Sequence, residues 1–368
     1  MSQLSYMEKL LDGVEVEWKS LSDIATITIG DFVHKNNQDS SAKYPVYNGG
    51  ISPTGYYEKY NNTGNKIIVS ARGANAGFVN RISQPYWAGN SCYSVGVKNS
   101  AEINWTYVFY FLKNAENKLI GNQQKGGIPA VSKKQMEVFQ IPIPPLNVQA
   151  EIVRILDTFT ELTAELTAEL TARQQQYAYY REQLLTFDNN QIQYKRLGDV
   201  VNIKNGKDWK NLGNGDIPVY GSGGVMTYVD TYAYDKPTVL IPRKGSITNI
   251  FYVETPFWNV DTIYYTEIDT EQILPKFFYY YMKTIDLMKL DTGSGRPSLT
   301  QAILNAIGIP VPSIVEQERI VSILDKFDAL TTSLTEGLPR EIELRQQQYE
   351  YYRDLLLSFP KPEVVAHD

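Results

Sequence analysis

The chain has 368 residues, 43% of them apolar and 21% charged, with a formal net charge of −6, and its length predicts two or three domains rather than one core. A single cysteine, Cys92, excludes an internal disulfide and a cysteine-clustered metal site, and two histidines, His34 and His367, provide little for a histidine triad or a zinc site. Because the start has no apolar signal segment and no run of about 18 apolar residues occurs, we expect a cytoplasmic protein.

Residues 1–145 form the first predicted domain. They are rich in Tyr, Val, Ile and Thr and are punctuated by Gly, Asn and Pro, which is typical of short strands joined by turns. The stretch "NWTYVFYFLKNAENKLIG" predicts a helix among them. We therefore predict an α+β domain in which most tyrosines fill strands and half-buried surfaces.

Residues 146–188 form a predicted long helix that contains the word "TAEL" in tandem. Its apolar residues are three and four positions apart, which predicts a heptad-like seam with one doubled step of four inside the tandem word. A helix of about forty residues would extend roughly 60 Å. The predicted seam consists of Ile152, Ile155, Phe159, Leu162, Leu166, Leu170, Tyr177 and Leu184.

The remainder of the chain repeats this plan. "IPIPPLNVQAEIVRILDTF" returns as "IPVPSIVEQERIVSILDKF", and "RQQQYAYYREQLLTF" returns as "RQQQYEYYRDLLLSF". Residues 189–312 thus form a second, similar domain and residues 313–360 a second helix. We expect the two helices to bury their seams on each other as a coiled coil, and residues 361–368 to form a disordered tail.

The second helical block carries four extra residues, most simply "EGLP" at 336–339, which keep its apolar stripe in phase on both sides. Pro339 after Gly337 predicts a kink or interruption, and a full break into a helical hairpin is the alternative. The predicted seam of this block consists of Ile320, Ile323, Phe327, Leu330, Leu334, Leu338, Tyr349 and Leu356.

This order of domains and repeated helical motifs, over nearly the whole chain, resembles the specificity subunit of type I restriction-modification enzymes. The resemblance implies two α/β target recognition domains, each recognising one half of a split, asymmetric DNA site. It implies two antiparallel spacer helices that also dock two methyltransferase subunits, to which restriction subunits add. It implies N6-adenine methylation with S-adenosylmethionine bound by the methyltransferase, and ATP and magnesium bound by the restriction subunit. We expect no cofactor and no metal on this chain.

No catalytic sequence motif accompanies the repeat. The sequence has no Asn/Asp-Pro-Pro-Tyr/Phe word for amino-methylation, no phosphate-binding loop for ATP and no nuclease motif. We therefore predict a subunit that is not catalytic by itself. The alternative from another class is a stand-alone coiled-coil interaction protein with two β-rich ligand-binding domains.

The charge is unevenly distributed along the chain. Residues 1–140 have a net charge of +3 and residues 188–308 of −1, whereas residues 141–187 have −3 and residues 309–368 have −5. DNA-binding proteins normally have a basic face, because neutralising phosphates supplies much of the affinity. We expect the partner subunits to make part of the phosphate contacts while this chain contacts the bases.

Candidate DNA contacts lie in turn-rich loops, where glycine permits close approach and a polar side chain can reach base edges. The alternative for each is an ordinary strand turn with solvated side chains. In the first domain the candidates are Asn48, Arg72, Asn75, Gln123, Gln124 and Lys125. In the second they are Ser222, Arg243, Lys244, Ser246, Asn249, Ser294, Arg296 and Ser298. The aromatic residues Tyr56, Tyr57, Trp87, Tyr228 and Trp258 could stack on a base, but we expect them to pack.

The tandem word gives the first helix a simple unit of length. Each four-residue unit lengthens a helix by about 6 Å and rotates the remainder of the helix by about 40°. The resemblance implies that the number of such units goes with the length of the gap between the two half-sites.

Overall fold

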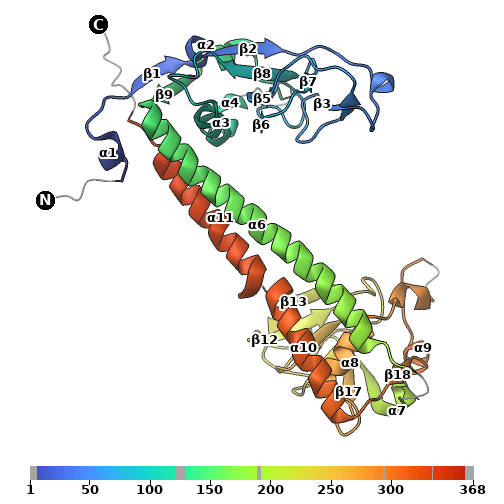
Figure 1. The fold of residues 1–368 in the computed structure, drawn as a ribbon. Helices are drawn as coiled ribbons and strands as arrows, with labels where there is room; N and C mark the ends of the chain where they lie inside the picture. The colour runs from blue at the N-terminus through green and yellow to red at the C-terminus, as the bar shows by residue number, and fades with distance from the viewer. Residues whose placement is uncertain (1–5, 121–128, 189–191, 293–294, 334, 361–368) are drawn as a thin grey trace, which may run out of the picture. The chain divides into compact units, whose positions relative to one another are not determined.

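The computed structural model describes residues 6–120, 129–188, 192–292, 295–333 and 335–360 (Figure 1). The chain divides into two compact units, residues 1–165 with 343–368 (unit 1) and residues 166–342 (unit 2). Each unit therefore contains one predicted domain together with parts of both helical blocks. The predicted tail, 361–368, lies outside the described residues.

Unit 1 is built on two small sheets and a two-stranded ribbon. The four-stranded sheet has the order β2-β8-β5-β6 and is antiparallel, and the three-stranded sheet has the order β4-β3-β7. The ribbon pairs β1 with β9, so the chain enters and leaves the domain side by side. The strands are β1 (Glu17–Ser20), β2 (Ala25–Ile29), β3 (Tyr44–Tyr47), β4 (Gly55–Tyr57), β5 (Lys66–Ser70), β6 (Val79–Ile82), β7 (Trp87–Ala88), β8 (Cys92–Val97) and β9 (Gln140–Ile143). The helices are α1 (Tyr6–Leu11), α2 (Leu21–Ile24), η1 (Lys35–Asn37), α3 (Trp105–Asn114), α4 (Glu116–Ile120) and α5 (Lys133–Glu137).

Unit 2 repeats this topology strand for strand. Its four-stranded sheet has the order β11-β17-β14-β15, its three-stranded sheet β13-β12-β16, and its ribbon pairs β10 with β18. The strands are β10 (Tyr194–Arg196), β11 (Val201–Asn205), β12 (Ile217–Gly221), β13 (Gly224–Val229), β14 (Thr238–Pro242), β15 (Phe251–Val253), β16 (Trp258–Asn259), β17 (Ile263–Ile268) and β18 (Gly308–Pro310). The helices are α7 (Leu197–Val200), α8 (Pro275–Met282), η2 (Leu287–Leu290) and α9 (Gln301–Asn305). The predicted internal repeat and the α+β class are confirmed.

The first helical block is one continuous helix, α6 (Leu146–Leu185), of 40 residues, as predicted. Its first half packs into the core of unit 1 through Ile152 and Leu156, together with Leu356 from the second block. Its second half packs into the core of unit 2 through Tyr177 and Leu185. Leu156 and Leu185 are absent from the predicted seam and directly follow two of its members, so α6 has a second apolar face that is turned toward the domains.

The predicted seam is buried only in part. Within unit 1 Phe159 stacks on Tyr352, with ring centroids 5.3 Å apart, and within unit 2 Tyr177 stacks on Phe327 at 5.9 Å. Leu162 is 39% exposed, so its predicted burial is wrong. Four members of the predicted seam are buried, namely Ile152, Tyr177, Ile320 and Leu356, and Leu334 lies outside the described residues. The remaining members are half-buried: Ile155, Phe159, Leu166, Leu170, Leu184, Ile323, Phe327, Leu330, Leu338 and Tyr349. The coiled coil stays a prediction.

The second helical block is interrupted, as Pro339 and Gly337 predict. It forms α10 (Ile314–Thr332) and α11 (Gly337–Leu356). Gly337 has φ +77°, and a Cβ there would come within 2.4 Å of the Ala329 carbonyl oxygen, so the turn requires glycine. Pro339 falls in the first turn of α11, where its missing N–H costs no helical hydrogen bond.

The repeated motif contains one glutamine whose side chain is buried in both copies. Gln149 in α6 accepts from Asn104 N at 2.8 Å and donates to the carbonyl oxygens of Glu102 and Pro144 at 3.0 and 2.8 Å. Gln317 in α10 makes the same three bonds, to Leu274 N, Gln272 O and Pro312 O, at 2.7 to 2.9 Å. Both glutamines are fully buried, and each joins its helix to the loop before α3 or α8. The amide thus satisfies three backbone groups that the fold would otherwise bury unpaired.

Candidate nucleic-acid interface

In unit 1 the candidate loop around Arg72 follows β5 and is held by its backbone between two other loops. Ala71 N donates to Ser91 O at 2.9 Å, and Gly73 N donates to Pro129 O at 2.9 Å. Gly73 has φ +93°, a conformation that favours glycine. The loop at 71–77 therefore converges with the loop before β8 and the segment before α5.

The side chain of Arg72 is exposed at this convergence. Its Nη2 lies 3.5 Å from Asn90 O, a long hydrogen bond, and in the described ranges no carboxylate forms an ion pair with it. An exposed guanidinium on a rigid glycine-containing turn can donate to a phosphate or, with two N–H groups, to a guanine edge. Of the candidates in unit 1, Arg72 has the chemistry and the exposure that DNA recognition requires.

Asn48 lies beside the same cluster. Its Oδ1 is buried and has no hydrogen-bond partner among the described residues, and a Cβ on Gly89 would come within 2.3 Å of this oxygen. Asn48 lines a cavity of about 390 Å³ together with Gln38, whose Oε1 is also buried without a partner in the same part of the chain. Both oxygens are buried against glycines, the Asn48 oxygen against Gly89 and the Gln38 oxygen against Gly55, so neither is open to a base in this structure. Sequence reasoning missed Gln38, because residues 32–38 have no glycine turn to single them out.

Asn75 is half-buried in the 71–77 turn, where its carbonyl oxygen accepts from Phe78 N at 3.0 Å. Gln123, Gln124 and Lys125 lie outside the described residues, as does Ser294 of unit 2. These four stay predictions from the sequence.

Unit 2 builds the same cluster at the equivalent place. Arg243 N donates to Thr262 O at 2.9 Å, and Gly245 N donates to Pro297 O at 3.0 Å. Gly245 has φ +91°, close to the value at Gly73. These bonds place Lys244 at the position of Arg72 and Arg243 at that of Ala71, so the backbone is repeated while the side chains differ.

The cations of this second cluster are partly neutralised. Lys244 Nζ forms an ion pair with Asp261 at 2.9 Å, and Arg243 Nη1 lies 3.3 Å from the Asp261 carbonyl oxygen. The side chains of Lys244 and Asp261 are 41% and 58% exposed, so water and salt weaken their attraction. Lys244 is thus held by a weak contact that a phosphate could replace, whereas Arg72 has no such carboxylate partner among the described residues.

The other candidates of unit 2 fall in the same cluster. Asn249 Nδ2 donates to Ser222 O at 3.1 Å, and Ser222 N lies 3.3 Å from Thr262 Oγ1. The backbone of Ser298 bridges to that of Lys244, and Ser298 N donates to Asp291 Oδ1 at 2.8 Å. Ser246 and Arg296 are exposed. The structure thus brings together the described loop candidates that the sequence placed far apart.

The aromatic candidates divide into two groups. Trp87 and Trp258 occupy equivalent positions, and their indole nitrogens donate to the carbonyl oxygens of Asp31 and Lys207 at 2.8 and 3.0 Å, as expected of packing residues. Tyr57 is half-buried and meets Trp87 edge to face at 5.1 Å. Tyr56 and Tyr228 are 39% and 54% exposed, so they are less packed than predicted.

Two further observations concern the described ranges only. No group of three or more His, Cys, Asp or Glu side chains is placed to hold a metal ion. No helix there combines the length and the apolarity needed to cross a membrane.

Comparisons with known proteins agree with the doubled architecture. A family model described as "Type I restriction modification DNA specificity domain" matches twice, at residues 13–173 and 189–344. The chain is 36% identical to a type I restriction enzyme specificity subunit of Escherichia coli over 100% of both proteins, and 30% identical to a second one from that organism over 91% of this chain and 93% of the relative. The crystal structure of a type I restriction-modification S subunit from M. genitalium has the same fold, with a TM-score of 0.69 at 22% identity over 95% of this chain and 98% of that one. The chain therefore belongs to the family of type I restriction-modification DNA specificity subunits and carries two copies of the family's domain.

Proposed function

We propose that this chain selects the DNA site of a type I restriction-modification complex, with each unit recognising one half of a bipartite, asymmetric sequence. The observation that carries the proposal is the doubled loop cluster, built on one backbone plan with different side chains. Arg72 in unit 1 has no ionic partner among the described residues, whereas its equivalent Lys244 is paired with Asp261 and is flanked by Arg243. Two copies of one frame with different donors suit two different half-sites.

The proposal assigns catalysis to other subunits. Two methyltransferase subunits would supply N6-adenine methylation with bound S-adenosylmethionine, and restriction subunits would supply ATP- and magnesium-dependent cleavage. Support comes from the absence of catalytic words in the sequence and from the family to which the chain belongs. The alternative, a stand-alone coiled-coil protein with two ligand-binding domains, finds no support among the relatives, which are named as restriction-enzyme specificity subunits.

The net charge of the two domains suggests how DNA contacts are divided between this chain and the methyltransferase subunits. The stretches 1–140 and 188–308 sum to a net charge of only +2, so phosphate contacts from this chain alone would be few. We expect the isolated chain to bind DNA weakly and the complex with methyltransferase to bind tightly. Filter binding of both at several salt concentrations tests this, and tight, sequence-specific, salt-resistant binding by the isolated chain would overturn it.

Arg72→Ala tests the assignment of the loop cluster. If the guanidinium contacts a base, the complex should lose roughly 1 to 3 kcal/mol of binding energy and become less selective at one position of the site. Lys98→Ala is the matched control, because Lys98 follows the end of β8 that is remote from the cluster, and its Nζ donates to Ser22 O. A uniform loss over all sequences would instead mark Arg72 as a phosphate contact.

A further inference from the structure

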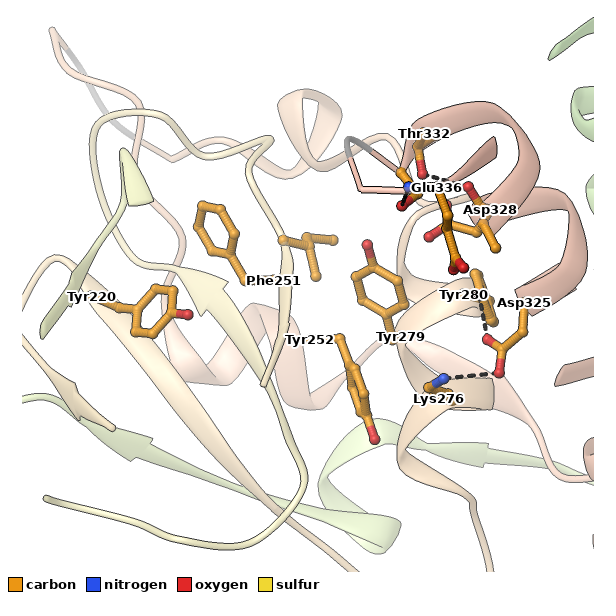
Figure 2. A pocket seen from close by; sticks show the side chains of 13 residues that line it. Tyr220, Phe251, Tyr252, Lys276, Tyr279, Tyr280, Asp325, Asp328, Thr332 and Glu336 are labelled. Carbon is orange, nitrogen blue, oxygen red and sulfur yellow. Dashed lines mark hydrogen bonds and ion pairs between the residues drawn. The ribbon is translucent and has the colours of Figure 1, made fainter. Parts of the chain in front are cut away.

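Unit 2 contains a cavity of about 570 Å³ between its sheets, α8 and the end of α10. Figure 2 shows aromatic side chains, among them Tyr252 and Tyr279, on one side of this cavity and carboxylates on the other. Asp325 and Asp328 come from α10, and Glu336 comes from the segment that interrupts the second helical block. Neither the loop cluster nor the predicted seam accounts for this combination.

The internal repeat shows what occupies the equivalent place in unit 1. Arg81 pairs with Ile67 across β5 and β6, as Tyr252 pairs with Val239 across β14 and β15, so Arg81 and Tyr252 are equivalent. The Arg81 guanidinium lies 5.1 and 5.5 Å from the ring centroids of Phe109 and Tyr110. Its Nη2 forms an ion pair with Asp157 at 2.9 Å. Unit 1 thus places one of its own arginines between aromatic rings and a carboxylate of α6.

Unit 2 keeps the frame of this site but not the arginine. Tyr280 donates to Asp325 at 2.6 Å, as Tyr110 donates to Asp157 at 2.6 Å. Tyr279 and Tyr280 stand where unit 1 has Phe109 and Tyr110. At the position of Arg81, however, is Tyr252, whose ring lies 5.9 Å from that of Tyr279. The cation of this site is instead Lys276, whose Nζ lies 5.6 Å from the Tyr252 ring centroid and pairs with Asp325.

The net charge at this site is more negative in unit 2 than in unit 1. Asp328 occupies the position that Thr160 has in unit 1, and Glu336 adds a third carboxylate. Lys276 Nζ compensates only Asp325, at 2.8 Å, and no ion pair joins Asp328 or Glu336 to a cation in the part of unit 2 that the structure describes. Three carboxylates and one ammonium leave a net charge of −2 at this cavity, whereas Arg81 and Asp157 balance each other in unit 1.

We propose that this cavity binds an arginine side chain of a partner protein. A guanidinium is planar, so it can lie against the aromatic wall of the cavity while its N–H groups donate to Asp328 and Glu336, the two carboxylates that Lys276 does not compensate. Unit 1 shows that an arginine between such rings and a carboxylate suits this frame. Residues 309–342, the part of this block that belongs to unit 2, carry six acidic and three basic residues, a net charge of −3, and this favours a basic protein surface as the source of the arginine.

The identity of the partner rests on the proposed function, which points to the methyltransferase subunit. The first test measures assembly of the full chain with that subunit. The double variant Asp328→Asn/Glu336→Gln should bind it at least about 10-fold more weakly, and less so at high salt. The matched control is Asp235→Asn/Glu271→Gln, which removes two exposed carboxylates of unit 2 that do not line the cavity. Equal affinities of the two double variants would overturn the proposal.

Tyr252→Arg tests the same idea in the opposite way, because it restores the arginine that unit 1 supplies from its own chain. This variant should keep its thermal transition and lose affinity for the methyltransferase subunit. Unchanged affinity in a folded Tyr252→Arg protein would count against the cavity as a docking site.

The second test needs no partner. Acetyl-L-argininamide, titrated into the full chain, should shift the tyrosine signals of Tyr252 and Tyr279 in NMR spectra to saturation, and neutral acetyl-L-citrullinamide should not. Equal responses to the two probes would overturn the inference. Saturable binding of spermidine, with assembly unaffected in Asp328→Asn/Glu336→Gln, would assign the cavity to a free polyamine instead. Failure of the unaltered chain to bind methyltransferase would refute the proposed function. The titration with acetyl-L-argininamide would still decide whether the cavity binds an arginine side chain.

Discussion

Asp261→Asn should increase the DNA affinity of the complex, which is an unusual direction for a substitution at a binding surface. Asp261 pairs with Lys244 at 2.9 Å in the loop cluster of unit 2, and both side chains are partly exposed. The pair is weak for that reason, so breaking it costs the fold less than about 1 kcal/mol. Removing the carboxylate leaves Lys244 available to a phosphate and also removes one negative charge from the loop cluster that we propose to contact DNA.

The size of the effect follows from counterion release. One additional phosphate contact steepens the dependence of log K on log salt by about 0.9, which corresponds to roughly 8-fold tighter binding near 0.1 M salt. The assay is equilibrium binding of the methyltransferase complex to its DNA site at four or more salt concentrations. Both the affinity and the slope should change.

Glu267→Gln is the matched control. Glu267 also forms an ion pair in unit 2, with Lys204 at 3.3 Å and similar exposure, but it lies near the end of β17 that is remote from the loop cluster. This substitution releases a lysine and changes the net charge by the same amount, yet it should leave DNA binding unaltered. If Asp261→Asn weakens binding, or if both variants strengthen it equally, the assignment of this loop cluster to DNA is wrong.

Three further predictions concern the spacer helix, the cores and the single thiol. Deleting Thr167–Leu170 from α6 removes about 6 Å and about 40° of helix, so methylation mapping should show a shorter gap between two unchanged half-sites, and an altered half-site with an unaltered gap would contradict this. Gln317→Ala leaves three buried backbone groups unpaired and should cost about 3 kcal/mol or more of unfolding free energy, measured by urea denaturation, whereas Gln301→Ala, which loses one bond of 3.3 Å, should cost less than about 1 kcal/mol. Burial raises the pKa of the Cys92 thiol to about 12, so this thiol should not react with Ellman's reagent at pH 8 in the folded protein and should react after unfolding. Because the pKa of the thiol is higher in the folded than in the unfolded protein, its contribution to stability is lost as the pH rises above the ordinary thiol pKa. Rapid labelling of the native chain would contradict the burial of Cys92.

The repeat could be predicted in detail because short sequence motifs define it. "IPxP" precedes each helical block, and the glutamine a few residues later is explained once its three backbone partners are seen. Gly73 and Gly245 marked the turns correctly, since a positive φ leaves a signal in the sequence itself. These features depend on residues close together along the chain.

Other features depend on tertiary contacts and left no such signal. The pairing of Lys244 with Asp261, and the buried oxygen of Gln38, required distant strands to be brought together. The stripe chosen for α6 omitted Leu156 and Leu185, because a single seam cannot describe a helix that packs against another helix on one face and a domain on another. The substitution of Tyr252 for Arg81 becomes visible only when the registers of the two sheets are compared.

We propose that two different loop clusters on one repeated backbone frame recognise two different half-sites. Mapping N6-methyladenine by long-read sequencing, in cells that carry the complex, tests it most directly. We expect one methylated motif in two unlike parts, separated by a gap of fixed length with no sequence preference. A continuous motif, a symmetric motif or no methylation above background would contradict it.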